Sequence, residues 1–277
     1  MIRSSAASWP PSRHLRSFHR RLLELRQHLV RDIEVVNGAV SYRFRCETVR
    51  EFNRCLKLFS KEPGTVRWIE SSVQSGQIFY DIGANIGVYT ILAARQVGPK
   101  GKVYAFEPHA ANFTRLIENV IQNRLQQVVV PCGVALDSRE GFAAFTYDSA
   151  RAGTSHSQLL PSADVGSGEI DELKYATTVD RLLDVGRMAA PHHVKIDVDG
   201  NEHRILEGMV KLLASSKAPV TLQVEMNEPH AAASRALLQA HGYTLIETHY
   251  TRSASRRREQ SGEAAHEGCN AIFRKAG

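Results

Sequence analysis

The chain has 277 residues, of which 43% are hydrophobic and 23% are charged, and its formal net charge is +6. This composition excludes a wholly disordered chain, a collagen-like chain and a small disulfide-rich protein, and it suits one large domain or two small ones. Because no stretch approaches 18 uninterrupted apolar residues, we expect no membrane-spanning helix.

The basic excess belongs to the N-terminal part. Residues 1–61 hold 13 Lys and Arg against 5 Asp and Glu, whereas residues 62–277 hold 22 against 24. The first 23 residues contain five arginines and no acid, which is typical of transit peptides and also of solvated basic extensions. We favour an extension that leads into a short helix over 15–30. Asn37-Gly38 between two β-prone runs then predicts a hairpin over 34–44.

The main domain is predicted to begin at residue 62, which divides the chain into a basic N-terminal extension (1–61) and a domain (62–277). From there, short apolar runs predict strands at 78–80, 103–106, 128–130, 194–196, 220–224, 243–246 and 271–273. Helices are expected between most of them, at 112–123, 202–213 and 231–241. Such alternation implies an α/β domain whose mostly parallel sheet is covered on both faces. Two polar segments, 148–177 and 251–268, are predicted as loops that shape an acceptor pocket.

The segment between the first strand of this domain and the next helix carries most of the functional information. Residues 81–87 read DIGANIG, so that a carboxylate precedes a turn with glycines at 83 and 87. Glycine permits a sharp turn and a close approach to a ligand, at the edge of the sheet where such folds bind ligands. Dinucleotide enzymes hold a pyrophosphate there, which Asp81 would repel. A ligand with an ammonium group and no phosphate, such as S-adenosylmethionine (SAM), suits this turn better.

The second strand supports a nucleoside-type cofactor. It ends in Glu107, 20 positions after Gly87, and Pro108 follows. A carboxylate at this place can accept hydrogen bonds from both ribose hydroxyls. A glutamate that only faces solvent is the simpler interpretation of this residue alone. Together with the glycine turn, at this spacing, it favours SAM.

The chain resembles the FkbM family of SAM-dependent methyltransferases. The resemblance rests on DIGANIG at 81–87, on AFEP at 105–108, on KIDVDGNE at 195–202 and on the lead-in EPGT at 62–65. It implies a Rossmann-like class I methyltransferase fold, with helices on both faces of a seven-stranded, mostly parallel sheet whose last strand is antiparallel. It also implies O-methylation of a hydroxyl on a glycan or a small-molecule natural product. The candidate cofactor-binding residues are Asp81, Gly83, Asn85, Gly87, Thr90, Glu107, Pro108 and Asp197.

Three acidic residues gather after the predicted strand 194–196. Asp197, Asp199 and Glu202 are the candidate catalytic residues, because an alcohol becomes a good nucleophile when a positioned base removes its proton. Acids at a helix start are also favoured by the helix dipole alone. A divalent cation held by these oxygens is possible, but we lean towards a base or a substrate-orienting role and predict no metal site. Asp199 departs from the family pattern, which more often has Glu there.

Other functions remain open at this stage. The basic N-terminal region raises a nucleic-acid-directed methyltransferase or an RNA-binding module as an alternative, although no nucleic-acid motif supports it. An NAD-dependent oxidoreductase and a non-catalytic SAM-binding protein are further candidates. The cysteines show no C-x-x-C pair, so we expect a reducing, cytoplasmic location and no zinc module. The expected partner is a small-molecule or glycan acceptor rather than nucleic acid, and the oligomeric state stays open.

Overall fold

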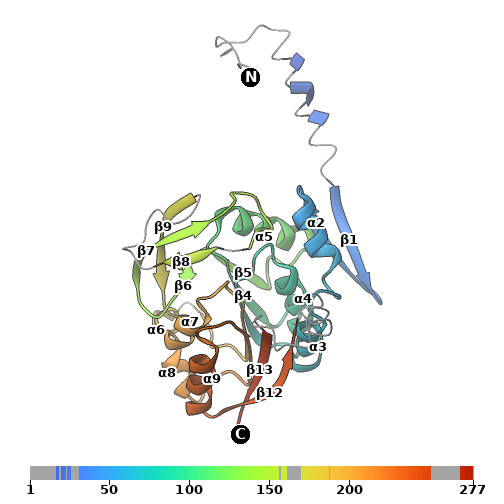
Figure 1. The fold of residues 1–277 in the computed structure, drawn as a ribbon. Coiled ribbons are helices and arrows are strands. Elements are labelled where there is room, and N and C mark those ends of the chain that lie inside the picture. The colour runs from blue at the N-terminus through green and yellow to red at the C-terminus, as the bar shows by residue number, and fades with distance from the viewer. Residues whose placement is uncertain are drawn as a thin grey trace, which may run out of the picture.

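A computed structural model describes residues 17–18, 20–22, 24–25, 31–155, 157–160, 170–186, 188–250 and 269–276. Seven strands of these residues form the central sheet (Figure 1). In spatial order they are β12 (Tyr243–His249), β13 (Cys269–Lys275), β11 (Thr221–Met226), β10 (His193–Ile196), β3 (Ile78–Ile82), β4 (Lys102–Phe106) and β5 (Val129–Cys132). Among these strands β13 alone runs in the opposite direction to the other six. The predicted sheet, including its antiparallel last strand, is confirmed.

Helices cover both faces of this sheet. One face is covered by α3 (Pro63–Ser72), α4 (Val88–Val97) and α5 (Ala110–Gln122). The other is covered by α6 (Val179–Asp184), α7 (Glu202–Glu207), α8 (Val210–Ala214) and α9 (Ala231–Ala240). Side chains alternate between the faces along each strand. Phe79 of β3 therefore belongs to the first core cluster, and its neighbour Tyr80 to the second.

The single helix expected over 202–213 is wrong, because the structure divides it into α7 and α8. The division falls at Gly208, where an added Cβ would lie 2.1 Å from the carbonyl oxygen of Asp137. Asp180 then accepts hydrogen bonds from the backbone nitrogens of Lys211 and Leu212 and so caps α8. A close packing contact and a side-chain cap, both from distant residues, override the local helical pattern.

The predicted hairpin near the N-terminus is confirmed as β1 (Arg31–Asn37) and β2 (Val40–Cys46), followed by α2 (Val49–Leu56). Tyr42 and Phe44 of β2 are buried in the same core cluster as α3, α4 and α5. Most of the helix expected over 15–30 lies outside the described residues, of which 17–18, 20–22 and 24–25 are helical. A domain boundary at residue 62 stays a prediction.

A small second sheet was not predicted. It contains β6 (Ala135–Leu136), β9 (Ile170–Thr177), β7 (Gly141–Tyr147) and β8 (Gln158–Leu160) in spatial order (Figure 1). The expected loop over 148–177 is thus wrong in part, since β8 and β9 fall within it. Charged and apolar residues alternate along part of β9, but the apolar Leu173 and Tyr175 are exposed, whereas the charged Glu172 and Lys174 are half-buried. The segment 251–268 lies outside the described residues.

Among the described residues, no helix combines the length and the apolar character that crossing a membrane requires.

Candidate active site

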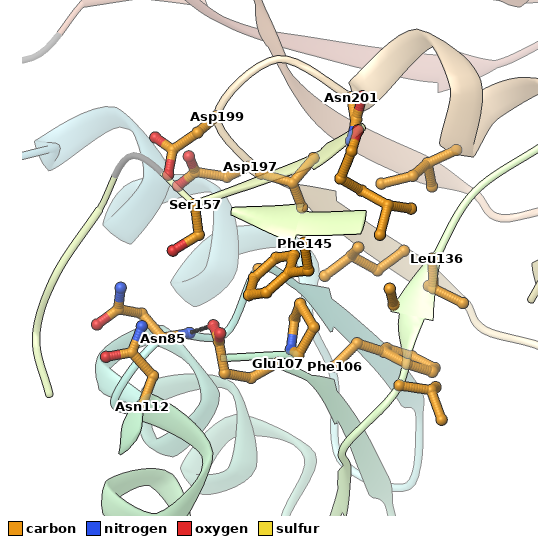
Figure 2. A pocket seen from close by; sticks show the side chains of 18 of the residues that line it. Asn85, Phe106, Glu107, Asn112, Leu136, Phe145, Ser157, Asp197, Asp199 and Asn201 are labelled. Carbon is orange, nitrogen blue, oxygen red and sulfur yellow. Dashed lines mark hydrogen bonds between the residues drawn. The ribbon is translucent and has the colours of Figure 1, made fainter. Parts of the chain in front are cut away.

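An open cavity lies at the carboxyl ends of β3, β4 and β10. Chain order reverses between β3 and β10, and ligands of open α/β sheets bind at such a switch point. Figure 2 shows Asp197 and Asp199 on one side of the cavity and Glu107 on the other. The small sheet contributes part of the apolar wall, through Leu136 and Phe145. The unpredicted sheet therefore helps to build the site.

The glycine turn forms one side of this cavity. Gly83 has φ +82° and donates its backbone N–H to the carbonyl of Phe106 at 3.0 Å. An added Cβ at Gly83 would lie 1.8 Å from the carbonyl oxygen of Asp197. Gly87, at the start of α4, has φ +86° and does not line the cavity. Steric conflict across the strands and left-handed backbone angles explain why this turn needs glycine.

Glu107 lies at the end of β4 and is 5% exposed. Its two carboxylate oxygens accept hydrogen bonds from the backbone nitrogens of Asn85 at 2.7 Å and of His109 at 2.9 Å. Burial raises the pKa of Glu107 to about 7, although these hydrogen bonds oppose the shift. The side chain of Asn112 also hydrogen-bonds this carboxylate, and the remaining lone-pair capacity is open to a ligand hydroxyl. Pro108 lines the cavity next to it.

Two buried hydroxyl groups in the cavity wall were not predicted. Thr154 Oγ1 and Ser157 Oγ have no hydrogen-bond partner among the described residues. The backbone beside them is fixed, because the Thr154 carbonyl accepts hydrogen bonds from Asn85 Nδ2 at 2.7 Å and from Asn112 Nδ2 at 3.2 Å. Buried hydroxyls are normally hydrogen-bonded, so these two are suited to a polar ligand in the cavity.

Asp81 and Thr90 lie beneath the glycine turn and do not line the cavity. Asp81 is 1% exposed, and its carboxylate accepts a hydrogen bond from Thr90 Oγ1 at 2.5 Å. Lys195 faces it from the neighbouring strand β10, in register, with Nζ 3.7 Å from Oδ1. Burial raises the pKa of Asp81, and Lys195 and Thr90 oppose that rise from inside the protein. Sequence reasoning treated Asp81 as facing a ligand because it did not pair the two strands.

Lys195 is the main charged residue that sequence reasoning missed. It is 1% exposed, and its Nζ lies 2.9 Å from Asp197 Oδ2 and 5.4 Å from the centre of the Tyr89 ring. Burial alone would lower the pKa of Lys195, but Asp197 and Asp81 outweigh it and raise that pKa. Burial likewise opposes ionisation of Asp197, yet Lys195 keeps the pKa of Asp197 below its usual value. The sequence did contain a sign of this role, because a lysine between Val194 and Ile196 interrupts an apolar strand.

Asp199 and Glu202 follow Asp197 in the turn after β10, and the structure places them differently. Asp199 lines the cavity and has φ +58°. Glu202 is turned inward, and one of its oxygens accepts hydrogen bonds from the backbone nitrogens of Val198 and Gly200 at 3.2 and 3.1 Å. Glu202 is buried and does not line the cavity. It holds the turn that presents Asp197 and Asp199.

Glu225, at the end of β11, adds a fourth carboxylate beside this turn. Asn227 Nδ2 donates to Glu225 at 2.9 Å and to Glu202 at 3.4 Å. Burial and the negative charge of the turn, chiefly that of Asp197, raise the pKa of Glu225 to about 8. The acidic cluster therefore retains a proton at neutral pH. Within the described part of the chain, no three His, Cys, Asp or Glu side chains are grouped so as to hold a metal ion.

Comparison with known families identifies this arrangement. The model of the methyltransferase FkbM domain matches residues 81–245, more than half of the chain. The chain belongs to the FkbM methyltransferase family. The match begins at Asp81 and includes the glycine turn, Glu107 and the whole acidic turn after β10, which are the elements that build the cavity. The cavity therefore belongs to a methyltransferase domain, and the family implies SAM as the methyl donor.

Two relatives that are named as methyltransferases are similar to this chain. Hexuronic acid methyltransferase AglP of Haloferax volcanii is 30% identical over 173 residues, which cover 62% of this chain and 66% of AglP, just under two thirds of its length. The 31-O-demethyl-FK506 methyltransferase FkbM of Streptomyces tacrolimicus is 26% identical over 196 residues, or 63% of this chain and 75% of that protein.

Solved structures with similar folds include a methyltransferase FkbM from Methylobacillus flagellatus. It is 13% identical, with a TM-score of 0.48, and the alignment covers 77% of this chain and 48% of that one. Fibrillarin from Aeropyrum pernix, with natively bound SAM, is 9% identical with a TM-score of 0.45, and 87% and 82% of the two chains are covered. The fold of this FkbM-family chain follows from its own strand order.

The residues of the cavity fit the donor that the FkbM family implies. Glu107 offers acceptor oxygens that suit the hydroxyls of a ribose, and the backbone of Gly83 lines the cavity without a side chain. The unpartnered hydroxyls of Thr154 and Ser157 add donors and acceptors in the same wall. Of the residues predicted from the sequence, five reach the cavity directly as cofactor candidates: Gly83, Asn85, Glu107, Pro108 and Asp197.

Proposed function

We propose that this protein is a SAM-dependent O-methyltransferase that methylates a hydroxyl group of a glycan or a small-molecule natural product. The observation that carries the proposal is a cavity that joins Glu107, suited to a ribose, to the carboxylates of Asp197 and Asp199. The relatives support the acceptor class, since one is named for a hexuronic acid and the other for an O-demethyl macrolide.

The cofactor residues divide into those that touch the ligand and those that support them. Gly83, Asn85, Glu107, Pro108 and Asp197 line the cavity, and we assign them to direct contact with SAM. The remaining candidates act from beneath or behind the turn. Asp81 and Thr90 brace β3 through their hydrogen bond, and Gly87 starts α4.

SAM supplies a methyl group on a sulfonium centre, which a hydroxyl oxygen can attack. The protein's part is to hold that hydroxyl and to take its proton. We assign proton acceptance to Asp199, which lines the cavity, and orientation to Asp197, which Lys195 keeps ionised. Glu202 acts by fixing the turn between them. This assignment keeps the three predicted catalytic residues but gives them different tasks.

Calorimetric titration with SAM, S-adenosylhomocysteine (SAH) and NAD tests the cofactor. We expect micromolar binding of SAM and SAH and no binding of NAD. The variant Glu107→Ala is expected to weaken SAM by about 1–3 kcal/mol, the scale of hydrogen bonds to a charged group. Binding of NAD without SAM would overturn the assignment while leaving the fold unchanged.

Release of SAH in the presence of candidate acceptors tests the reaction. Glucuronic acid, glucose and a macrolactone with a free hydroxyl represent the two acceptor classes, and transfer RNA represents the nucleic-acid alternative. We expect turnover with an acceptor of the first group and loss of that turnover in Asp199→Asn. Methylation of the RNA alone would replace the proposed acceptor class.

A further inference from the structure

The outer side of α2 carries large apolar side chains that are exposed. Val49, Phe52 and Leu56 are 75%, 43% and 50% exposed, and their spacing of three and four residues places them on one side of the helix. Glu51 and Cys55, on the side that faces the protein, are buried. Figure 1 shows α2 at the edge of the molecule beside β1. The helix therefore packs on the protein through one side and presents an apolar ridge, made of Val49, Phe52 and Leu56, on another.

A second amphipathic element precedes the hairpin. Residues 17–18, 20–22 and 24–25 are helical, and Phe18, Leu22 and Leu25 among them are 57%, 46% and 54% exposed. Positions 18, 22 and 25 follow the helical repeat, so these side chains also lie on one side. Arg20 and Glu24 lie on the other side, where they form a salt bridge at 2.8 Å. Two elements of the N-terminal part thus show the same pattern.

Positive charge accompanies these apolar faces. Arg50 and Lys57, at the two ends of α2, are exposed next to the apolar ridge. Glu51, the acidic residue of this helix, is buried and lies 2.6 Å from Arg115 Nε, so it does not offset that charge at the surface. Residues 1–61 as a whole hold 13 Lys and Arg against 5 Asp and Glu. The outer side of α2 is therefore both apolar and cationic.

This combination discriminates between kinds of partner. A second copy of the chain would cover the apolar ridge but would bring like charges together. A nucleic acid would match the cations and leave the apolar side chains in water. A membrane surface with anionic headgroups matches both properties, because the headgroups attract the cations while the apolar side chains enter the boundary of the acyl region.

We propose that the apolar ridge of α2 and the helical residues before the hairpin bind an anionic lipid surface. They lie in the interface of the membrane and do not cross it, since α2 has eight residues and a spanning helix needs about 20. Arg54 Nη2 of α2 donates to Ser155 Oγ at 2.8 Å, and Thr154 next to Ser155 lines the candidate active site. Docking through α2 therefore brings that site close to the lipid surface.

Sedimentation of the full chain with lipid vesicles tests this inference. We expect binding to phosphatidylglycerol vesicles that weakens as the salt concentration rises, and binding to phosphatidylcholine vesicles that is weaker by about tenfold or more. Phe52→Ser/Leu56→Ser should weaken binding to phosphatidylglycerol by about tenfold or more, because it removes two side chains that become buried in lipid. The matched control is Phe142→Ser/Leu173→Ser. It removes the same two types of side chain, which are 68% and 66% exposed on β7 and β9, and should leave binding unchanged.

A second pair of variants tests the charge. Arg50→Gln/Lys57→Gln should weaken binding to phosphatidylglycerol by about 10- to 30-fold, from about 1 kcal/mol for each basic residue near an anionic surface. Lys100→Gln/Lys217→Gln removes two exposed lysines from other parts of the chain and should leave binding unchanged. Urea denaturation shows whether each variant folds. If the apolar double variant does not fold, Val49→Ser, at the most exposed position of the ridge, takes its place.

The inference is overturned if the wild type does not sediment with phosphatidylglycerol vesicles, or if test and control variants lose binding equally. Binding to transfer RNA without binding to vesicles would assign the surface to nucleic acid instead. Self-association that Phe52→Ser/Leu56→Ser abolishes, again without binding to vesicles, would assign it to a second copy of the chain.

Discussion

Position 83 requires glycine for two separate reasons. Its left-handed backbone angle disfavours any side chain, and the carbonyl of Asp197 occupies the place of a Cβ. The second requirement comes from a strand more than 100 positions away in the sequence. A substitution there must move either the glycine turn or the residues that follow β10, and both line the cavity.

We expect Gly83→Ala to abolish measurable SAH binding, since the added Cβ would lie 1.8 Å from a backbone oxygen. Gly38→Ala is the matched control. Gly38 also has a positive φ, of +59°, but no described atom lies within 4 Å of its added Cβ. Calorimetry would measure affinity, and urea unfolding would show whether each variant folds. A folded Gly83→Ala protein with wild-type affinity, or a stability loss no larger than that of Gly38→Ala, would contradict this explanation.

At the scale of elements, β3 and β10 act as a pair. Their parallel register sets Lys195 opposite Asp81, and the next inward-facing position of β10 brings Asp197 to the same ammonium group. Buried ions are tolerated when they are paired, and removing one partner leaves the others uncompensated. The two strands beneath the cavity are therefore coupled by charge as well as by backbone hydrogen bonds.

Lys195→Met is expected to lower the free energy of unfolding by about 3–5 kcal/mol, because it leaves the buried Asp81 and the half-buried Asp197 without their cation. Asp81→Asn/Lys195→Met should recover part of that loss, since it removes one stranded charge. Lys217→Met, on an exposed turn, should change stability by less than about 0.5 kcal/mol. Urea denaturation measures all three. A Lys195→Met protein as stable as the control would show that the pairing contributes little.

The central sheet could be predicted because its strands are apolar runs, whose pattern is local. Gly83 and Glu107 could be placed for the same reason, since each stands at the end of such a run. The small sheet was missed because β9 is rich in charged residues, and only its pairing with β7 distinguishes it from a loop. The roles of Lys195 and Thr154 depend on contacts across the fold, which no single stretch of sequence contains.

At the scale of the whole molecule, the buried carboxyl groups of the site make the stability of the protein depend on pH. Burial raises the pKa of Glu107 to about 7 and that of Glu225 to about 8, against an ordinary value of 4.5. Between pH 6.5 and 8 the folded protein therefore retains protons that the unfolded chain has lost. Burial also lowers the pKa of His193 to about 4 from 6.5, which favours the folded state as pH rises, but that effect is complete near pH 6.5.

Raising the pH from 6.5 to 8 should therefore lower the free energy of unfolding of the ligand-free protein, by about 1–2 kcal/mol. Glu225→Gln should flatten this dependence, because an amide has no proton to lose, whereas the exposed Glu228→Gln should leave it as in the wild type. Chemical denaturation at several pH values, with buffers of equal ionic strength, measures the slope. Stability that rises across this interval would contradict the protonation of Glu107 and Glu225 at neutral pH.

The contact between α5 and the N-terminal hairpin has a consequence for solubility. Asn123 accepts from the backbone nitrogen of Arg43 at 3.0 Å and donates to the carbonyl of the same residue at 2.6 Å, while Asn119 accepts from the nitrogen of Arg45 at 2.8 Å. These amides bond to β2 as a neighbouring strand would. An open β-edge is a template on which another chain can add a strand and aggregate. Here two asparagines from a helix occupy that template, so this edge of β2 is closed to such growth.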